Sequence, residues 1–257
     1  PNAPGCSTGE TLAGGVITVP AGVTSFTVTV PTLQDSTDEP AETTALIVGG
    51  VAATGTINDD DNAPTITSIE PGAPGAGDDA VVEGTDLVYT VSLSNPSSVA
   101  TTYPFSLGGG TASASDFTNT PVFSNGVTLA GGILTVPAGV TSFTVTVPTI
   151  DDVLAEPGAN ETLPLSIGGV TATGTIQDNE GAPVVASVTS DAQTEGTSLV
   201  HTVTLSGASA SATTYAFSLT DGSASAGSDY TNAPVFSNGV TLAGGVITVP
   251  AGVTSFT

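Results

Sequence analysis

Residues 128–149 read TLAGGILTVPAGVTSFTVTVPT, and the alternation in the second half of this stretch decides the fold. From Ser142 to Val147, Phe143 and the two valines lie on one face, and the serine and the two threonines lie on the other. A period of two residues is that of a β-strand with one buried face. The preceding Pro137-Ala138-Gly139 has turn chemistry. The stretch therefore predicts antiparallel strands whose apolar face joins a core.

The same stretch occurs three times in the chain. Residues 11–32 match residues 128–149 at 20 of 22 positions, and a third copy runs from Thr241 to Thr257. The offsets are 128 − 11 = 117 and 241 − 128 = 113 residues. A period of this length corresponds to a whole domain and not to one coil of a solenoid. We expect a partial repeat with closing strands over 1–62, a complete repeat over 63–181, and a partial repeat with opening strands over 182–257.

Seven strands are predicted in the complete repeat, and helix signals are absent. The expected ranges are 65–69, 87–94, 101–107, 127–136, 141–149, 161–167 and 170–176. Short strands separated by Gly, Pro, Asn and Asp indicate two packed antiparallel sheets, as in an immunoglobulin-like sandwich. The joints at 58–64 and 177–183 are short and end in proline, which fixes φ. The prediction is an all-β rod of tandem sandwiches.

The charge balance excludes several classes of partner. The chain has 24 Asp and Glu, no Lys and no Arg, for a formal charge of −24. Nucleic acids and anionic membrane surfaces are disfavoured, because both are bound through cationic side chains. With 39% hydrophobic and 9% charged residues the chain is expected to fold. No apolar run approaches the ~20 residues of a membrane span, so we expect no direct membrane insertion of this segment.

The chain has one cysteine and one histidine that could take part in catalysis or metal binding. Cys6 stands where the other repeats have Phe123 and Phe236, which predicts a small core residue. His201, the sole histidine, stands in the place of Tyr89 and is predicted to be an exposed strand residue. A zinc site or a Ser-His-Asp triad repeated along the array would need histidines that the other repeats lack. No Trp is available as a sugar platform, so no enzymatic activity is predicted.

Carboxylates of the complete repeat concentrate in its loops. They are Asp116, Asp151, Asp152, Glu156, Glu161 and Asp178. Loops after alternate strands of a sandwich lie at the same end, so these side chains are expected to gather at one pole. Without Lys or Arg they must be neutralised by protonation, water and salt, or bound cations. Calcium takes 6–8 oxygen ligands and suits such a pole better than magnesium. The alternative is that they are ordinary polar turn residues.

Several motifs resemble the Calx-beta domain over nearly the whole chain. They are Glu83-Gly84, GTASASDF (110–117), VPTIDD (147–152), Glu161-Thr162, TATGTIQDNE (171–180) and DGSASAGSDY (221–230). That family consists of immunoglobulin-like sandwiches that bind calcium at one pole, and it forms tandem arrays in large bacterial surface proteins and adhesins. The resemblance implies that Ca²⁺ is bound by the six carboxylates above, with Glu70 as an addition. In the partial repeats it implies Asp35, Glu39, Glu42, Asp59, Asp60, Asp61 and Asp229.

One departure from the pattern bears on the number of sites. The first repeat has Gln34-Asp35 where the complete repeat has Asp151-Asp152. We therefore expect fewer calcium sites in the first repeat.

The resulting functional hypothesis is a non-enzymatic extracellular structural segment. It would be a calcium-rigidified stalk or extender of a cell-surface protein, adhesin or fibre, in head-to-tail contact with neighbouring repeats or with copies of itself. The alternative is the subunit of a self-assembling surface filament in which half domains of successive copies complement each other. The partial repeats are equally expected if the sequence is a window of a longer continuous array. A third reading, in which the array itself binds a glycan, has no specific support in the sequence.

Overall fold

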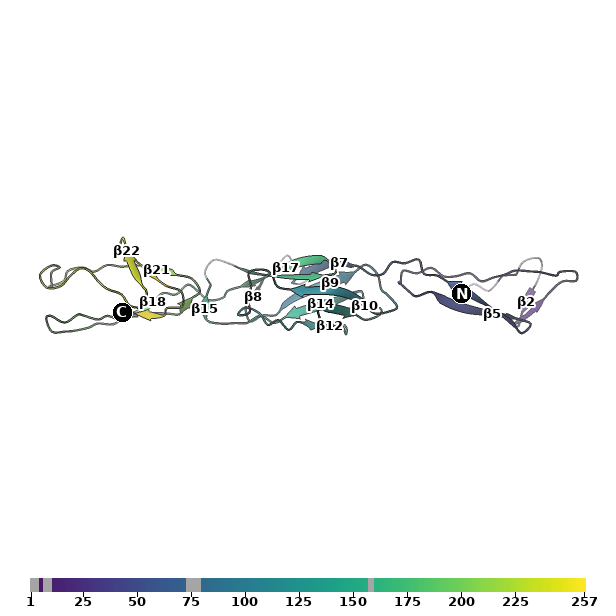
Figure 1. Cartoon of the computed structure of the whole chain (residues 1–257), viewed down its shortest axis with the longest axis horizontal. Coiled ribbons are helices and arrows are strands. Elements are labelled where there is room, and N and C mark those ends of the chain that lie inside the picture. Colours follow the sequence, from purple (N-terminus) through teal and green to yellow (C-terminus); the bar gives the residue numbers. More distant parts are fainter. Residues whose placement is uncertain (1–4, 7–10, 73–79, 157–159) are drawn as a thin grey trace.

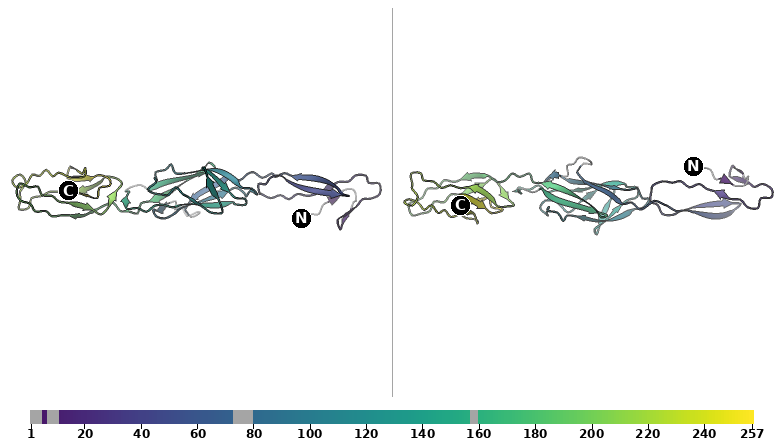
Figure 2. Two further views of the ribbon diagram at one scale, coloured as in Figure 1. Left: turned by 60° about the horizontal axis from the view of Figure 1, so that its bottom comes forward. Right: turned by 90° about the horizontal axis from the view of Figure 1, so that it is seen from above.

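The protein is an elongated row of small β-sheets. The computed structural model describes residues 5–6, 11–72, 80–156 and 160–257. Within these ranges every regular element is a β-strand, which confirms the all-β prediction, and no helix there is suited to crossing a membrane. Figure 1 shows a central group of strands between two end groups, and the same extended form is seen from the two directions in Figure 2.

The central repeat is a sandwich of two sheets. The six-stranded sheet has the order β12 (Thr128–Ala130), β13 (Ile133–Val136), β10 (Thr101–Leu107), β16 (Glu161–Ile167), β17 (Val170–Gln177) and β8 (Ala80–Val82). The four-stranded sheet has the order β11 (Val122–Phe123), β14 (Ser142–Val147), β9 (Leu87–Leu93) and β7 (Ile66–Pro71). Most neighbouring strands are antiparallel, and β8 pairs with β17 in parallel.

The core lies between these two sheets and follows the alternation of the sequence. On β14, Phe143, Val145 and Val147 are buried, and their hydroxyl-bearing neighbours face outward. Leu163 and Leu165 of β16 are fully buried in the same cluster. Full burial of each such side chain contributes roughly 1.5–3 kcal/mol. The predicted core face of residues 142–147 is confirmed.

One expected strand is two strands in the structure. Residues 127–136 form the hairpin β12–β13, because Gly131 and Gly132 have φ of 57° and 78° and reverse the chain. Two positive φ values suit a two-residue hairpin turn, which two glycines adopt without strain. Because apolar residues continue on both sides of the turn, the sequence pattern was interpreted as one strand. The short strands β8, β11 and β15 (Leu154–Ala155) were not predicted.

The first repeat has no buried residue among those described. It contains three strand pairs: β1 (Gly5–Cys6) with β4 (Val28–Thr29), β2 (Thr11–Ala13) with β3 (Val16–Thr18), and β5 (Glu42–Val48) with β6 (Val51–Ile57). The backbone of Cys6 pairs with Val28. The prediction that Cys6 fills a core concerns a side chain outside those described.

The third repeat has a smaller core than the central one. Its two sheets are β18 (Val185–Val188), β19 (Val203–Leu205) and β24 (Ser255–Phe256), and β21 (Thr213–Ala216), β23 (Val246–Val249) and β22 (Thr241–Ala243). The buried cluster is Leu205, Val240, Ile247, Val249 and Phe256. His201 is exposed, as predicted, but it precedes β19, so its placement in a strand was wrong. The ring Nδ1 lies 2.7 Å from the carbonyl oxygen of Thr189.

Both joints between repeats are made by the same backbone contact. At the first joint the N–H of Ser98 donates to the carbonyl of Asp38 at 2.9 Å. At the second, β15 pairs in parallel with β20 (Ala208–Ser209), and the N–H of Ala210 donates to the carbonyl of Ala155 at 2.9 Å. These are corresponding positions, since 155 − 38 = 117 and 210 − 98 = 112. Each repeat is therefore tied to the next by more than its linker.

A tyrosine hydroxyl also fastens each proline linker to the repeat that follows. Tyr103 donates to the carbonyl of Pro64 at 2.8 Å, and Tyr215 donates to that of Pro183 at 2.7 Å. A fixed φ at the proline and a hydrogen bond on its carbonyl both restrict the hinge.

Candidate metal site

Carboxylates gather at the two joints. Among the described residues, three groups have one oxygen from each member within 4.8 Å of the others: Asp59, Asp60 and Asp61; Glu83, Asp178 and Glu180; and Asp116, Glu156 and Glu161. The members of the last two groups lie in the segments that follow β8, β10, β15 and β17, except Glu161, which is the first residue of β16. This pole faces the third repeat, because β15 carries the contact to β20. The loops meet here for the reason expected from the sandwich topology.

Asp116 is the buried member of its group, with 6% of its surface exposed. Its carboxylate accepts hydrogen bonds from the backbone N–H of Ser113 and, at 2.9 Å, from the hydroxyl of Ser115. Burial acts to raise the pKa of Asp116, but these donors and a proton from Glu161 outweigh it, so the pKa is lowered. Asp116 is therefore a fixed negative charge in the loop.

Glu161 faces that charge and holds a proton more tightly than a free glutamate. Burial, then the charges of Asp116 and Glu156, raise the pKa of Glu161 to about 7. The pKa of Glu156 is also raised, by burial and then by Asp116, Asp152 and Asp178. A cation placed among these groups would remove the repulsion and compete with the proton.

The metal-free protein should therefore become less stable as the pH rises. The pKa of Glu161 is about 7 in the folded chain and near 4.5 when unperturbed, so the folded state binds more protons between these values. The contribution of Glu161 to the stability is fully present below pH 4.5 and is lost as the pH rises through 7. The thermal midpoint of metal-free protein, followed from pH 5 to about pH 8, should fall on this account. Glu161→Gln should make this fall shallower without removing it, because the pKa of Glu180 is also raised to about 7, and an unchanged slope in that variant would contradict the assignment.

Asp178 organises the second group through backbone donors. The N–H of Glu156 donates to Asp178 Oδ2 at 2.8 Å, and that of Glu180 donates to Oδ1 at 3.0 Å. Glu180 Oε2 is buried and receives no N–H or O–H from any described residue. The pKa of Glu180 is raised to about 7. The largest cause is a hydrogen bond between the carboxyl groups of Glu180 and Glu83, followed by burial and by the carboxylate of Asp178. This oxygen needs a proton or a cation to be satisfied.

Gly84 allows the loop after β8 to approach Asp151. Its φ is +75°, and a Cβ atom there would lie 2.9 Å from the Cβ of Asp151. Both the backbone conformation and the contact therefore require glycine. The side-chain amide of Asn179 donates to Asp151 Oδ1 at 2.8 Å. The Glu83-Gly84 motif thus brings Glu83 to this pole.

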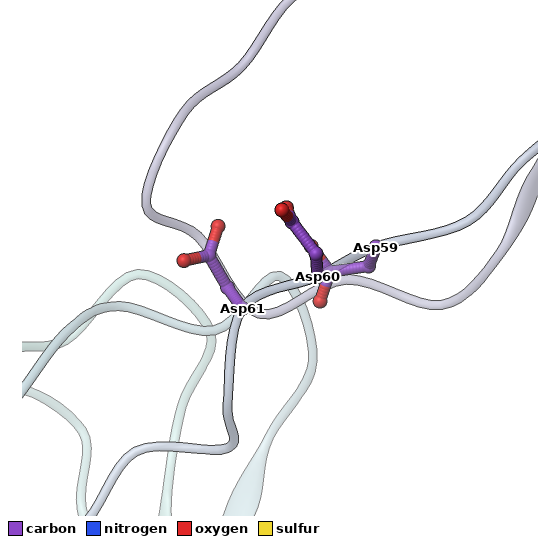
Figure 3. A group of neighbouring side chains, drawn as sticks. All are labelled: Asp59, Asp60 and Asp61. Carbon is purple, nitrogen blue, oxygen red and sulfur yellow. The ribbon is translucent and has the colours of Figure 1, made fainter.

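Two hydrogen bonds of the second joint recur at the first joint, and in one of them the amide and the carboxylate have changed places. Figure 3 shows Asp59, Asp60 and Asp61 on the linker. The N–H of Glu39 donates to Asp59 Oδ2 at 3.0 Å, as that of Glu156 does to Asp178.

The exchange concerns one amide and one carboxylate. The side-chain amide of Gln34 donates to Asp60 Oδ1 at 2.8 Å, whereas at the second joint the amide is Asn179 and the carboxylate is Asp151. Each joint keeps one amide and one carboxylate in this pair. Gln34 by itself therefore does not reduce the number of carboxylates at the first joint.

Repulsion among the acids is also seen at the first joint. The pKa of Glu39 is raised by partial loss of solvent and then by the charges of Glu42, Asp35 and Asp59. The pKa of Asp61 is raised by partial loss of solvent and then by the charges of Asp59, Asp60, Asp35 and Asp38. The loop acids of the first repeat therefore act on one another electrostatically.

Seven predicted ligands belong to none of the three groups among the described residues: Asp35, Glu39, Glu42, Glu70, Asp151, Asp152 and Asp229. Asp35 and Asp152 accept backbone N–H groups of Thr37 and Leu154 at 2.8 and 2.6 Å. Glu70, Glu42 and Asp229 are exposed, on β7, on β5 and in a loop of the third repeat. Asp151 is linked to the second group by the hydrogen bond that it accepts from Asn179, the residue between Asp178 and Glu180.

Two members of the groups were not predicted as ligands, although both belong to motifs that carry the Calx-beta resemblance. They are Glu83 and Glu180. Glu83 precedes the glycine of its motif, and Glu180 closes the acidic segment after β17.

No model of a known protein family matches the chain, and no curated protein matches it. The Calx-beta resemblance therefore remains a prediction from motifs.

Two solved structures are similar in part. One is S-layer protein SbsC domains 4 and 5, at 16% identity over 51% of this chain and 59% of that chain, with a TM-score of 0.27. The other is surface layer protein SbsC domains 4–9, at 16% identity over 84% of this chain and 31% of that chain, with a TM-score of 0.28. The chain thus spans less than two thirds of either structure, and at these TM-scores nothing about its function follows from the likeness.

Proposed function

We propose that this chain is a structural segment of an extracellular protein, in which calcium at the joints holds successive sandwiches in a row. The observation that carries the proposal is that both joints have the same construction. Each has a backbone hydrogen bond across the boundary, a fixed proline linker and an acidic group beside it. A spacer requires a joint that repeats, whereas a unique recognition surface does not.

The donor set fits a hard divalent cation. Every candidate ligand is an oxygen, and the chain has no Lys or Arg to neutralise the groups. Glu83, Asp178 and Glu180 would hold one ion, and Asp116, Glu156 and Glu161 another, with backbone carbonyls and water completing the shell. The ion would neutralise the carboxylates and stiffen the joint. Millimolar calcium, as found outside cells, fills even weak sites of this kind.

The proposal predicts that the rod loosens when calcium is removed. Small-angle scattering of the whole chain should give a single extended form with calcium and a broader distribution of shorter forms with a chelator, because like charges repel at the joints. The double variant Asp59→Asn, Asp178→Asn should respond less to calcium. Asp86→Asn is the control, since it makes the same charge change at an exposed residue in none of the three groups. Identical scattering curves with and without calcium would refute the mechanism.

A further inference from the structure

The two joints share a docking contact that is fixed by a buried serine. Ser97 pairs in parallel with Asp38 at the first joint, and Ser209 pairs in parallel with Ala155 at the second. Each serine is 4% exposed. The carbonyl of Ser97 accepts the N–H of Gly139 at 2.8 Å, and that of Ser209 accepts the N–H of the corresponding glycine at 2.9 Å. The surface that receives the preceding repeat is therefore built alike at both joints.

Side-chain hydrogen bonds reinforce the first joint. The hydroxyl of Ser97 donates to Asp38 Oδ2 at 2.7 Å. The side-chain amide of Asn95 donates to the carbonyl of Asn62, the last residue of the first repeat, at 2.9 Å. Between these two donors, Pro96 has a fixed φ and accepts the N–H of Asp38 at 3.1 Å. The preceding repeat is thus held at two separate points, which restricts its rotation more than one point would.

The second joint, at β15 (Figure 1), has other residues at these positions. The receiving loops align as LSNPSS (93–98) and LSGASA (205–210), and the linkers align as NAP (62–64) and GAP (181–183). The exchanges are Asp38 for Ala155, Asn62 for Gly181, Asn95 for Gly207 and Pro96 for Ala208. Neither alanine nor glycine has a polar side-chain atom. The two side-chain hydrogen bonds of the first joint therefore cannot form at the second.

Neither glycine of the second joint is required by its backbone or by its surroundings. The φ angles of Gly181 and Gly207 lie outside the left-handed region, and a Cβ added at either would meet no atom of the described residues within 4 Å. Other residues would therefore fit both positions without strain. Glycine widens the range of backbone conformations, and Ala208 lacks the ring that fixes φ at Pro96. These residues give the second joint freedom of movement.

We propose that the second joint is a hinge and the first a stiff connection, so that the row of repeats bends between the central and the third repeat. Hinges are formed by a few loop residues that absorb backbone rotation, and Gly181 and Gly207 lie on the linker and on the receiving loop. The pairing of β15 with β20 and the hydrogen bond from Tyr215 to Pro183 keep the two repeats together. The movement is therefore a limited rotation about this contact.

A cation at the second joint would act on the hinge, a consequence that rests on the calcium function proposed above. Asp178 and Glu180 lie in the segment between β17 and Gly181. An ion bound by these two carboxylates would hold the linker on one side of the hinge. Calcium should then narrow the range of angles at this joint.

The test is a distance measurement across the second joint by pulsed electron paramagnetic resonance. In a Cys6→Ser background, spin labels are attached at Thr173→Cys and Thr241→Cys. Both threonines are exposed and lie in strands, on β17 of the central repeat and on β22 of the third. The whole chain is measured with a chelator, so that the result does not depend on calcium binding. The expected result is a broad distribution of distances.

Gly207→Asn should narrow that distribution, because its amide can donate to the carbonyl of Gly181 as Asn95 does to that of Asn62. Gly222→Asn is the matched control, since Gly222 has equally open surroundings, has no left-handed φ and lies outside the joint. This control should leave the distribution broad. Equal distributions in the two variants would overturn the proposal, as would a narrow distribution in the parent chain.

The reverse exchange tests the first joint in the same background. Labels at the corresponding threonines, Thr54→Cys and Thr128→Cys, span that joint. Asn95→Gly removes the amide that holds Asn62 and should broaden the distribution of distances. Asn119→Gly makes the same change at an exposed residue away from the joint and should not broaden it. Equal distributions in these two variants would refute the stiffening role of Asn95.

Repeating both measurements with calcium separates the hinge from the metal function. If Gly207→Asn narrows the distribution in chelator and calcium changes neither distribution, the hinge stands and only the metal function is refuted.

Discussion

Calcium should raise the thermal unfolding midpoint of the chain by on the order of 10 °C, and magnesium should raise it much less. Calcium sites of extracellular modules bind with Kd of about 10⁻⁴–10⁻³ M, so about 10 mM calcium adds roughly 1.4–2.7 kcal/mol per site. Two filled groups at the pole of the central sandwich would add roughly twice that. For a domain of this size each kcal/mol shifts the midpoint by several degrees. Calorimetry with calcium, with magnesium and with a chelator measures the shift.

The same measurement on two variants separates specific binding from general charge screening. Asp178→Asn removes the carboxylate that receives the backbone N–H groups of Glu156 and Glu180, so most of the calcium shift should be lost. Asp86→Asn changes the charge equally outside the groups and should keep the shift. Equal midpoints with calcium, magnesium and chelator would refute calcium binding, and equal losses in both variants would indicate screening.

The sandwich could be predicted from the sequence because its determinants are local. The alternation over Ser142–Val147 places Phe143 and the valines in the core, and it does so in the structure. The hairpin turn at Gly131 and Gly132 was missed because apolar residues continue through it. Its signal was the pair of glycines itself.

The site could be predicted only in part, because it depends on distances between loops. The sequence placed Asp116 and Glu161 at one pole, and the structure brings their carboxylates together. It did not identify Glu83, whose approach depends on the contact of Gly84 with Asp151, two residues far apart in the sequence. Nor did it show that Gln34 is balanced by Asp60, since pairs of this kind appear only when the loops are placed side by side.

A pair of corresponding leucines shows the limit of local reasoning most clearly. Leu87 and Leu199 stand in similar sequences, GTDLVYTV and GTSLVHTV, and have opposite exposures. What differs is a hairpin that crosses Leu87 and that no described segment provides for Leu199. Burial in this fold is therefore a property of the completed sandwich and not of the strand.

Valine at two equivalent glycines should accordingly have opposite effects on stability. Gly174→Val forces a side chain against Leu87 and the hydroxyl of Tyr89, both closer than 3.0 Å to the new Cβ. Overpacking of this kind costs about 1–3 kcal/mol, and it would also disturb the hydrogen bond from Tyr89 to the carbonyl of Leu163. At Gly55, which holds the place of Gly174 in the first repeat, an added Cβ would meet only Thr44 of the same hairpin, at an ordinary contact distance of 3.4 Å. Gly55→Val also gains strand propensity, so this variant should unfold no earlier than the parent chain.

Calorimetry on the two variants and the parent chain measures the three midpoints. Gly174→Val should lower the midpoint and Gly55→Val should not, because Leu87 and Tyr89 approach residue 174 and no equivalent side chains approach residue 55 among the described residues. Equal losses in the two variants would show that the close approach of Leu87 and Tyr89 is not what requires glycine at residue 174.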